Sequence, residues 1–251
     1  MVLDPGPQAT LQGAPRQGLR QFGMPAAGAA DPVSLAIANR LVGRRADAVA
    51  IEVTFGPARF RSEARMAVAI SGADADVRID GTVQPGRQTL RAEAGSLIEI
   101  GPFRAGARTY LAASGDIDAD VAFGSPSTYL PAGLGGFGGR VLRKGDLVRI
   151  RNVTAPDITY VPLDLQLFLS RSFALRAVPG PDWFPGCEKI ADAPFAVTSR
   201  TSRMGIEIEG ALPAVDDGSL KPSSAVMPGA LQITPGGRGF LLLADGQTTG
   251  G

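Results

Sequence analysis

The residues of this sequence best suited to chemistry are polar and amide side chains at the ends of apolar, strand-like runs. Three such runs in the second half read "SRTSRMGIEIEG", "PSSAVMPGALQITP" and "LLLADGQTTGG". Their donors and acceptors suit an amide, a urea-like group or a carboxylate as ligand. The same residue types also satisfy turns, so they indicate a site only as a converging set. The candidates are Arg203, Ser223, Gln232, Asp245, Gln247 and Thr248.

The first half offers a long, glycine-rich loop at residues 10–31, which lacks periodicity and leads into a helix. Loops held by regular elements are common places for binding residues. Capping of the helix alone accounts for Asp31, and a solvated position would account for Arg16 equally well. The polar residues of the loop and helix are Gln12, Arg16, Arg20, Asp31, Asn39 and Arg40, and we take Gln12, Arg16, Asn39 and Arg40 as site candidates.

The chain contains no histidine and a single cysteine, Cys187. This excludes a Ser-His-Asp triad, an imidazole metal site and a zinc cluster, so we expect no metal. Acid–base chemistry is left to carboxylates, Lys, Tyr, backbone groups or a partner's residues. With the family resemblance described below, our candidate base is Asp245, one of several carboxylates in the chain. Arg16 and Arg203 are the candidate contacts for an anion or oxyanion, and the remaining candidates bind and orient substrate. Random loss of a rare residue would explain the absence of histidine as well as a mechanistic reason would.

Composition narrows the class of protein. The formal net charge is +1, with acidic and basic residues mixed, and no basic stripe with interleaved aromatics suggests nucleic-acid binding. No run approaches the roughly 20 apolar residues of a membrane span, and the N-terminus lacks the pattern of a secretory signal. A lone cysteine excludes an intrachain disulfide. We expect a soluble, cytoplasmic protein.

Two further motifs resemble ligand sites but fit ordinary loops better. The run "GLGGFGGRVLRKGD" at residues 133–146 is glycine-rich, yet it lacks both the P-loop pattern and the strand–GxGxxG–helix context. A glycine-rich hairpin loop is the favoured interpretation. The run "SGADADVRIDG" at residues 71–81 carries three aspartates without the glycine and terminal glutamate of a calcium loop. A solvated hairpin edge is favoured there.

The elements that must position these residues are mainly strands. Apolar residues alternate with polar ones in "MAVAISG", "SLIEIG", "DLVRIRN" and "GIEIEG", each bounded by turn residues. One helix is predicted over residues 31–43, with Asp31 as its N-cap and Pro32 at its first position. A shorter, interrupted helix is predicted near "DWFPGCEKIAD". Two prolines in residues 152–162 place a domain boundary, which gives lobes at 1–152 and 153–251.

Two stretches, at residues 86–100 and 139–150, share a Gly-Arg, Leu-Arg, Gly, Leu pattern that ends in Ile. We favour a recurring turn-then-strand arrangement over a duplicated unit.

The ordered blocks of the chain resemble the carboxyltransferase-type family called allophanate hydrolase subunit 2, which includes the C subunit of 5-oxoprolinase and is similar to the carboxyltransferase domain of urea carboxylase. The matching blocks are "TLQGAPRQGLRQFGMPAAGAAD", "ANRLVG", "IEVTFGPARF", "ISGAD", "YLAASGDID", "GSPSTY", "GGFGGRVLRKGD", "VPGP", "SRMGIEIEG", "MPGALQI" and "LLADGQTTGG".

The resemblance implies two cyclophilin-like β-barrel lobes with few short helices and a site between them. It also implies part of a hydrolase that, with A-subunit-like and B-subunit-like partners and ATP used by the complex, opens the cyclic amide 5-oxoproline to glutamate. The alternative is a carboxyltransferase subunit acting on urea or a related amide. Biotin would then arrive on another chain, because this one lacks the Met-Lys attachment pair. A second alternative is a non-catalytic regulator that binds a B-subunit-like partner; prolyl isomerase, resting on fold analogy alone, ranks last.

This chain departs from the family pattern in two places. The family reads Gln-Asp-x-Gly-Arg where this chain has Gln12, Gly13, Ala14, Pro15 and Arg16, so an acidic position is occupied by Gly13. The family also continues for several strands after "TTGG". The resemblance therefore predicts that the C-terminal lobe is truncated and lacks closing strands.

Overall fold

The computed structural model describes residues 1–166, 169–170, 172–183, 186–213, 222–234 and 236–250. The chain forms two compact units, and each is described by itself. The first consists of Met1–Pro15 and Asp31–Ser172, and the second of Arg16–Ala30 and Phe173–Gly251. These units differ from the predicted lobes in two respects. The break in the chain falls 20 residues later, after residue 172 rather than 152, and the loop at Arg16–Ala30 belongs to the second unit.

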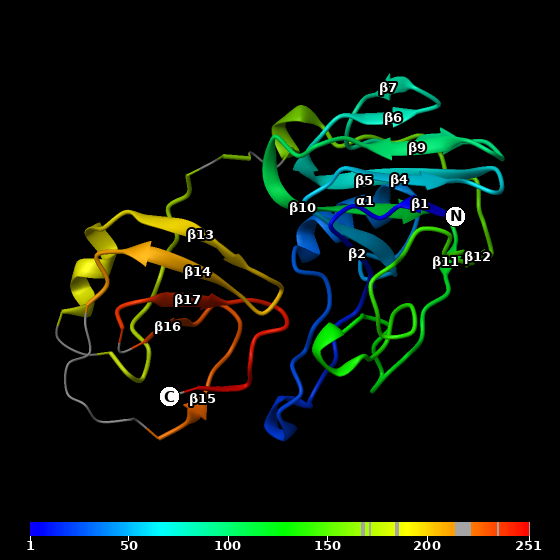
Figure 1. The fold of residues 1–251 in the computed structure, drawn as a ribbon. Coiled ribbons are helices and arrows are strands. Elements are labelled where there is room, and N and C mark those ends of the chain that lie inside the picture. Colours follow the sequence, from blue (N-terminus) through cyan, green and yellow to red (C-terminus); the bar gives the residue numbers. More distant parts are fainter. Residues whose placement is uncertain (167–168, 171, 184–185, 214–221, 235, 251) are drawn as a thin grey trace. The chain divides into compact units, whose positions relative to one another are not determined.

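Antiparallel sheets dominate the first unit (Figure 1). One five-stranded sheet has the order β1 (Val2–Asp4), β4 (Ala58–Arg61), β9 (Leu97–Ile100), β6 (Val77–Ile79) and β7 (Thr82–Gln84). The other has the order β2 (Gln8–Gln12), β3 (Ala50–Thr54), β10 (Ala105–Ala113), β5 (Met66–Asp74) and β8 (Leu90–Ala92). A short pair, β11 (Asp116–Ile117) and β12 (Ile150–Arg151), completes the unit.

The alternation seen in the sequence explains the core of the first unit. On both five-stranded sheets, every second side chain points to the same face, and the side chains on that face are buried in one apolar cluster. Examples are Leu11, Val53, Phe60, Val68 and Ile98. Burying one face of each sheet is what period-2 patterning achieves. Most predicted strands are confirmed. The run "DLVRIRN" is an exception, because only its last part forms a strand, as β12.

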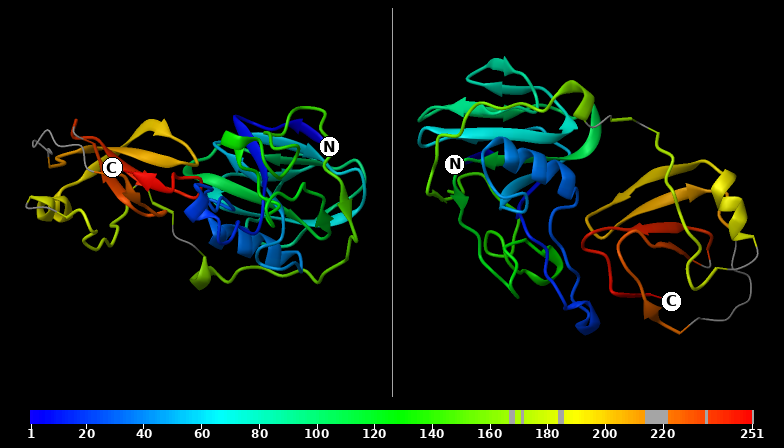
Figure 2. Two further views of the ribbon diagram at one scale, coloured as in Figure 1. Left: turned by 90° about the horizontal axis from the view of Figure 1, so that it is seen from below. Right: turned by 180° about the vertical axis from the view of Figure 1, so that it is seen from behind.

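The helix α1 (Pro32–Leu41) begins as predicted, with Asp31 accepting a hydrogen bond from the backbone N–H of Ser34 at 3.0 Å. Seen from behind, α1 lies beside the strands of the first unit (Figure 2), where it packs on β5 and β10. In the described part of the chain, no helix is both long and apolar enough to cross a membrane. The predicted second helix is a 3-10 helix, η4 (Cys187–Asp192). Other 3-10 helices in the described residues are η1 (Arg20–Phe22), η2 (Leu130–Ala132) and η3 (Leu163–Leu165).

A buried polar network holds the start of α1. The hydroxyl of Tyr110 accepts a hydrogen bond from the backbone N–H of Asp31 at 2.8 Å and donates one to Glu52 at 2.7 Å. Tyr110 and Glu52 are directly opposite each other on β10 and β3, and both are almost fully buried. Burial raises the pKa of Tyr110, and the neighbouring Glu52 carboxylate raises it further. Tyr110 therefore remains a hydrogen-bond donor at any ordinary pH.

The second unit contains a four-stranded antiparallel sheet in the order β13 (Phe195–Thr201), β14 (Gly205–Gly210), β17 (Gly239–Leu242) and β16 (Leu231–Ile233). A two-stranded ladder joins β15 (Ser224–Ala225) to β18 (Thr249–Gly250). The prediction of a mainly β protein with few helices is confirmed. Among the described strands, no sheet closes into a barrel.

At the end of the glycine-rich run at residues 133–146, Arg140 and Asp146 form an ion pair. Because of this pair, the free energy of unfolding is expected to depend on pH. Both oxygens of Asp146 accept hydrogen bonds from Arg140, at 2.7 and 2.8 Å, and the backbone N–H of Arg143 donates a third. Arg140 lowers the pKa of Asp146 below its ordinary value of 3.8. The pair therefore stabilises the folded chain above pH 3.8, and this stabilisation is lost as the pH falls through the lowered pKa.

We expect the free energy of unfolding of the wild type to fall more steeply below about pH 4 than that of Asp146→Asn, because only the wild type must protonate this carboxylate. Urea titrations between pH 7 and pH 2.5 measure both. If the free energy of unfolding falls equally steeply with decreasing pH in both proteins, Asp146 does not contribute to the pH dependence of stability.

Candidate functional site

The centre of the second unit is a buried ion pair between two of the predicted site residues. Arg203 lies in the turn between β13 and β14, and Asp245 lies in the loop after β17. The Nε and Nη2 atoms of Arg203 donate to Oδ2 and Oδ1 of Asp245, at 2.9 and 3.0 Å. The exposed fractions of the two side chains are only 4% and 2%. A bidentate pair shielded from water in this way fixes the plane of the guanidinium.

The loop that the sequence singled out contributes directly to this centre. The carbonyl oxygen of Gly28 accepts a hydrogen bond from Nη2 of Arg203, and the N–H of Ala27 donates to Ala244 at 3.2 Å. The backbone N–H of Arg16 donates to Ala26 at 2.7 Å, and the Arg16 side chain is 2% exposed. The second unit thus contains two buried arginines, Arg16 and Arg203.

Two facing amides lie in the same unit. The Nε2 atom of Gln247 donates to Oε1 of Gln232 at 2.8 Å. A Cβ at Gly250 would lie 2.5 Å from Nε2 of Gln232, so the glycine leaves room for this amide against the backbone. Thr248 is buried, and its carbonyl oxygen accepts from the N–H of Val226 at 3.0 Å. The run at residues 246–250 therefore leads from an amide-bearing loop into β18.

Sequence reasoning placed Arg20 among the polar residues of the loop but gave it no role. Its Nη2 atom donates to the carbonyl oxygens of Val226 and Gln247, at 2.5 and 3.3 Å. Arg20 therefore ties the loop to Val226, directly after β15, and to Gln247, two residues before β18. The signal available was a second arginine four residues after Arg16 in an aperiodic loop. Ser223, in contrast, is exposed just before β15.

In the first unit, Gln12 ends β2 and is fully buried. Its Nε2 atom donates to the Thr10 hydroxyl at 3.0 Å and to the Thr128 carbonyl oxygen at 3.2 Å. Beside it, a Cβ at Gly13 would lie 3.2 Å from the carbonyl oxygen of Asp47 and from Cγ2 of Val49. The position that is acidic in the family pattern is thus tightly packed against neighbours here.

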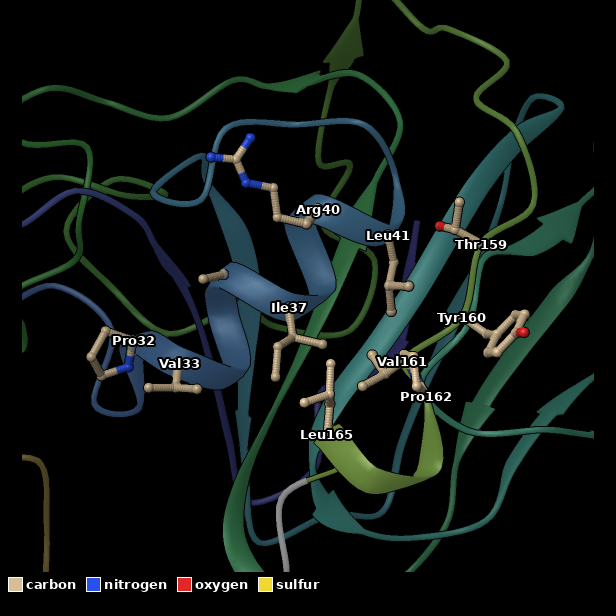
Figure 3. A pocket seen from close by; sticks show the side chains of 11 residues that line it. Pro32, Val33, Ile37, Arg40, Leu41, Thr159, Tyr160, Val161, Pro162 and Leu165 are labelled. Carbon is tan, nitrogen blue, oxygen red and sulfur yellow. The ribbon is translucent and has the colours of Figure 1, made fainter.

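Asn39 and Arg40 have different surroundings. The buried Asn39 donates through Nδ2 to the carbonyl oxygens of Ala46 and Ala48, at 3.2 and 2.8 Å, so its contacts hold the loop after α1. Arg40 is exposed and lines an apolar groove of about 620 Å³ between α1 and residues 159–165 (Figure 3). In that view the Arg40 guanidinium points away from Ile37 and Leu165, which line the groove.

A smaller hollow of about 270 Å³ in the first unit is more polar. It is lined by the ion pair of Arg44 with Asp116, and by Arg45 with Asp47 at 3.2 Å. Each cation there has its own carboxylate.

The aspartates of residues 71–81 hold the local structure of a hairpin. Asp74 and Asp76 bind Arg104, while Asp80 accepts from Ser96 and from the N–H of Leu97. Hydrogen bonds from Arg104 lower the pKa of Asp74.

Comparison with known proteins identifies the family. The family model described as carboxyltransferase domain, subdomain A and B, matches residues 22–251. The chain belongs to this carboxyltransferase family. It is 33% identical to the C subunit of 5-oxoprolinase from Escherichia coli strain K12, covering all of this chain and 81% of that protein. It is also 28% identical to urea amidolyase of Lachancea kluyveri, where it covers 15% of the relative.

Among solved structures, that of the protein TTHA0988 matches all of this chain with a TM-score of 0.91 and 27% identity. The chain spans half the length of that solved chain. The carboxyltransferase family therefore occurs as a separate subunit in one relative and as a small part of a long chain in others. The predicted meeting of candidates from both halves of the chain in one crevice stays a prediction.

The described contacts link four of the ten site candidates of this carboxyltransferase chain directly, as two pairs. Arg203 and Asp245 are directly bonded, and Gln232 and Gln247 are directly bonded. Gln12 is buried in the first unit with its own partners. The assignment of Asp245 as a base stays a prediction, since both of its oxygens hold Arg203.

Proposed function

We propose that this chain is the C subunit of an ATP-dependent 5-oxoprolinase, a hydrolase that opens the cyclic amide 5-oxoproline to glutamate. The observation that carries the proposal is the match to the C subunit of the Escherichia coli 5-oxoprolinase, which extends over the whole chain and most of that relative. Matches to urea amidolyases cover the chain at lower identity and only a small part of much longer proteins.

The chemistry of the site supports this choice. Opening a lactam places negative charge on the carbonyl oxygen in the transition state, and fixed donors in a water-poor site stabilise such charge. Arg203 is held in one orientation by Asp245 and Gly28, so it needs no reorganisation as charge develops. The amides of Gln232 and Gln247 offer a donor and an acceptor to orient the C–N unit. In this proposal Asp245 keeps its predicted role as the base and also positions Arg203 through both of its oxygens.

The proposed complex also contains A-subunit-like and B-subunit-like proteins and acts in the cytoplasm. ATP is used by the complex, and we assign no residue of this chain to hold it. The C subunit of 5-oxoprolinase from Haemophilus influenzae, 28% identical over the whole chain, is consistent with a separate subunit of this kind.

The second candidate function is carboxyl transfer to urea or a related amide, favoured by the urea amidolyase matches. A biotin carried on another chain would supply the carboxyl group. Urea presents the same N–H and carbonyl groups as a lactam, so the amide pair of Gln232 and Gln247 suits either substrate.

We expect the purified chain, mixed with its cognate partner subunits, to form glutamate from 5-oxoproline only when ATP is present. The same mixture should consume no ATP with urea, bicarbonate and a biotinylated carrier protein. Glutamate is measured by amino-acid chromatography and ATP use by phosphate release. ATP use with urea but not with 5-oxoproline would favour carboxyl transfer, and assembly without either activity would favour a regulator.

A further inference from the structure

The helix α1 has an apolar side that no described residue covers. Its inner side chains, such as Leu35 and Ala38, are buried where α1 packs on β5 and β10. Val33 and Ile37, one helical turn apart, line the groove on the other side, and the exposed fraction of Val33 is 53%. Only Arg40 is charged among the residues of α1. A helix that is apolar on nearly all sides is typical of a position buried on all sides.

The opposite wall of the groove is apolar as well. It is formed by residues 159–165, where Tyr160 and Leu165 have exposed fractions of 72% and 66%. Figure 3 shows the side chains of this wall and those of α1 on either side of the groove. Every residue that lines the groove belongs to the first unit, so the groove does not depend on where the second unit lies.

The buried residue Thr89 joins the two walls where α1 ends. Its hydroxyl donates to the Leu41 carbonyl oxygen at 2.6 Å, and its N–H donates to the Thr159 carbonyl oxygen at 2.8 Å. These bonds fix the spacing of the walls within the chain itself. A surface that is already formed costs little conformational entropy when a partner binds to it.

A single cation lies at the groove. Arg40 is exposed in the last turn of α1, and its guanidinium has no carboxylate partner among the described residues. Arg44, four residues later in the chain, is by contrast paired with Asp116. A ligand that covers the apolar walls can therefore place a carboxylate beside Arg40 without breaking an existing ion pair.

The exposure of the walls favours a polypeptide over a small molecule as the ligand. Small-molecule pockets enclose most of their ligand, whereas Val33, Tyr160 and Leu165 each expose about half or more of their side chains. Exposed apolar surface of this kind marks contacts between proteins. The helical spacing of Val33 and Ile37 suits a second helix, whose apolar anchors recur at the same spacing. In two relatives the matched region also adjoins further polypeptide, since it covers 50% of the TTHA0988 chain and 15% of urea amidolyase.

We propose that the groove between α1 and residues 159–165 docks an amphipathic helix of the B-subunit-like partner. The apolar face of that helix packs on Val33, Ile37 and Leu165, and one of its carboxylates pairs with Arg40. This inference rests on the proposed function for its partner and assigns the surface that the partner uses. The B-subunit-like partner belongs both to the 5-oxoprolinase complex and to the regulator alternative, so its binding can be measured whether or not the complex is active.

The first test compares one substitution at two valines. Calorimetry with the purified B-subunit-like partner, without ATP or 5-oxoproline, gives the dissociation constants. Val33→Glu puts a charge against the apolar face of the docked helix and should weaken binding at least about 10-fold. Glutamate is favourable in the first turn of a helix, so α1 should still fold.

Val83→Glu is the matched control for this test. Val83 lies on β7, outside the groove, and its exposed fraction of 54% is almost the same as that of Val33. This variant should bind like the wild type. Equal losses in the two glutamate variants, or no loss in either, would overturn the proposal.

The second test concerns the charge of Arg40. At about 50 mM salt, Arg40→Gln should weaken binding about 3- to 10-fold, and at about 500 mM salt the loss should shrink because salt screens an exposed ion pair. Arg78→Gln, at an exposed arginine on β6, should have no effect at either concentration. A loss that is independent of salt, or one that Arg78→Gln shares, would show that Arg40 does not pair with the partner.

Hydrogen exchange of the wild-type chain locates the partner without any substitution. The B-subunit-like partner should slow exchange at residues 159–165, which are exposed in the free chain. Protection only outside the groove, or no binding of this partner, would overturn the proposal. A wild-type dimer that Val33→Glu dissociates, seen by analytical ultracentrifugation, would make a second copy the occupant and would also overturn it.

Failure of the proposed function can be told apart from failure of this inference. A complex that assembles through the groove but opens no lactam would refute the proposed function alone. Opening of 5-oxoproline by a complex in which Val33→Glu binds as tightly as the wild type would refute the docking surface alone.

Discussion

Replacing Asp245 with asparagine is expected to lower the free energy of unfolding of the chain by about 3 to 5 kcal/mol. Both side chains of the Arg203–Asp245 pair are almost fully buried, and Asp245 supplies an acceptor to each of two guanidinium nitrogens. The variant leaves a buried cation without this counter-charge, and desolvation of an uncompensated charge is costly. Urea unfolding followed by circular dichroism, with the pH held at 7, measures the effect.

The chain offers a matched control in the pair of Asp118 with Arg151, whose side chains are 29% and 66% exposed. Asp118→Asn should cost less than about 1 kcal/mol, since solvent screens an exposed pair. Replacing both buried partners, as in Arg203→Met with Asp245→Leu, should recover part of the stability, because no lone charge then remains. Losses of similar size in Asp245→Asn and Asp118→Asn would contradict the importance of the buried pair.

Replacing Arg203 with lysine is expected to reduce the turnover of 5-oxoproline by about 100-fold. Lysine keeps the positive charge but cannot form two parallel hydrogen bonds to Asp245 while also donating to Gly28. The ammonium group would therefore adopt several positions, and stabilisation of developing charge depends on a fixed one. Steady-state rates of glutamate formation by the reconstituted complex measure the change.

Assembly must be checked in the same samples, because a misfolded chain would also lower the rate. Size-exclusion chromatography should show Arg203→Lys in the complex at wild-type stoichiometry. Arg200→Lys serves as a control, since Arg200 lies three residues earlier on β13 and its side chain is 68% exposed. Wild-type turnover by Arg203→Lys would show that the orientation of this guanidinium does not matter.

The local features of the fold could be predicted from the sequence because they depend on short-range physics. Period-2 patterning marked β5, β9 and β14, and an aspartate before a proline marked the start of α1. In residues 148–151, two apolar residues alternate with two arginines, yet only Ile150–Arg151 forms a strand, since an alternating pattern becomes a strand only where a partner strand pairs with it.

Long-range contacts limited what the sequence could predict. The amide of Gln12 is held by Thr128, 116 positions later, and no local pattern links the two. The loop at residues 16–30 belongs to the second unit through bonds such as that of Ala27 to Ala244, so a single cut in the chain could not divide it correctly. The pairing of Arg203 with Asp245 could likewise not be predicted from the sequence, although both residues were identified as site candidates by their type and their place at the ends of strands.

The most direct test of this account omits the chain from the reconstituted complex. The account predicts that the partner subunits alone, given ATP and 5-oxoproline, form no glutamate above background, and that adding this chain restores glutamate formation in proportion to its amount. Glutamate formed at the full rate by the partners alone would contradict it.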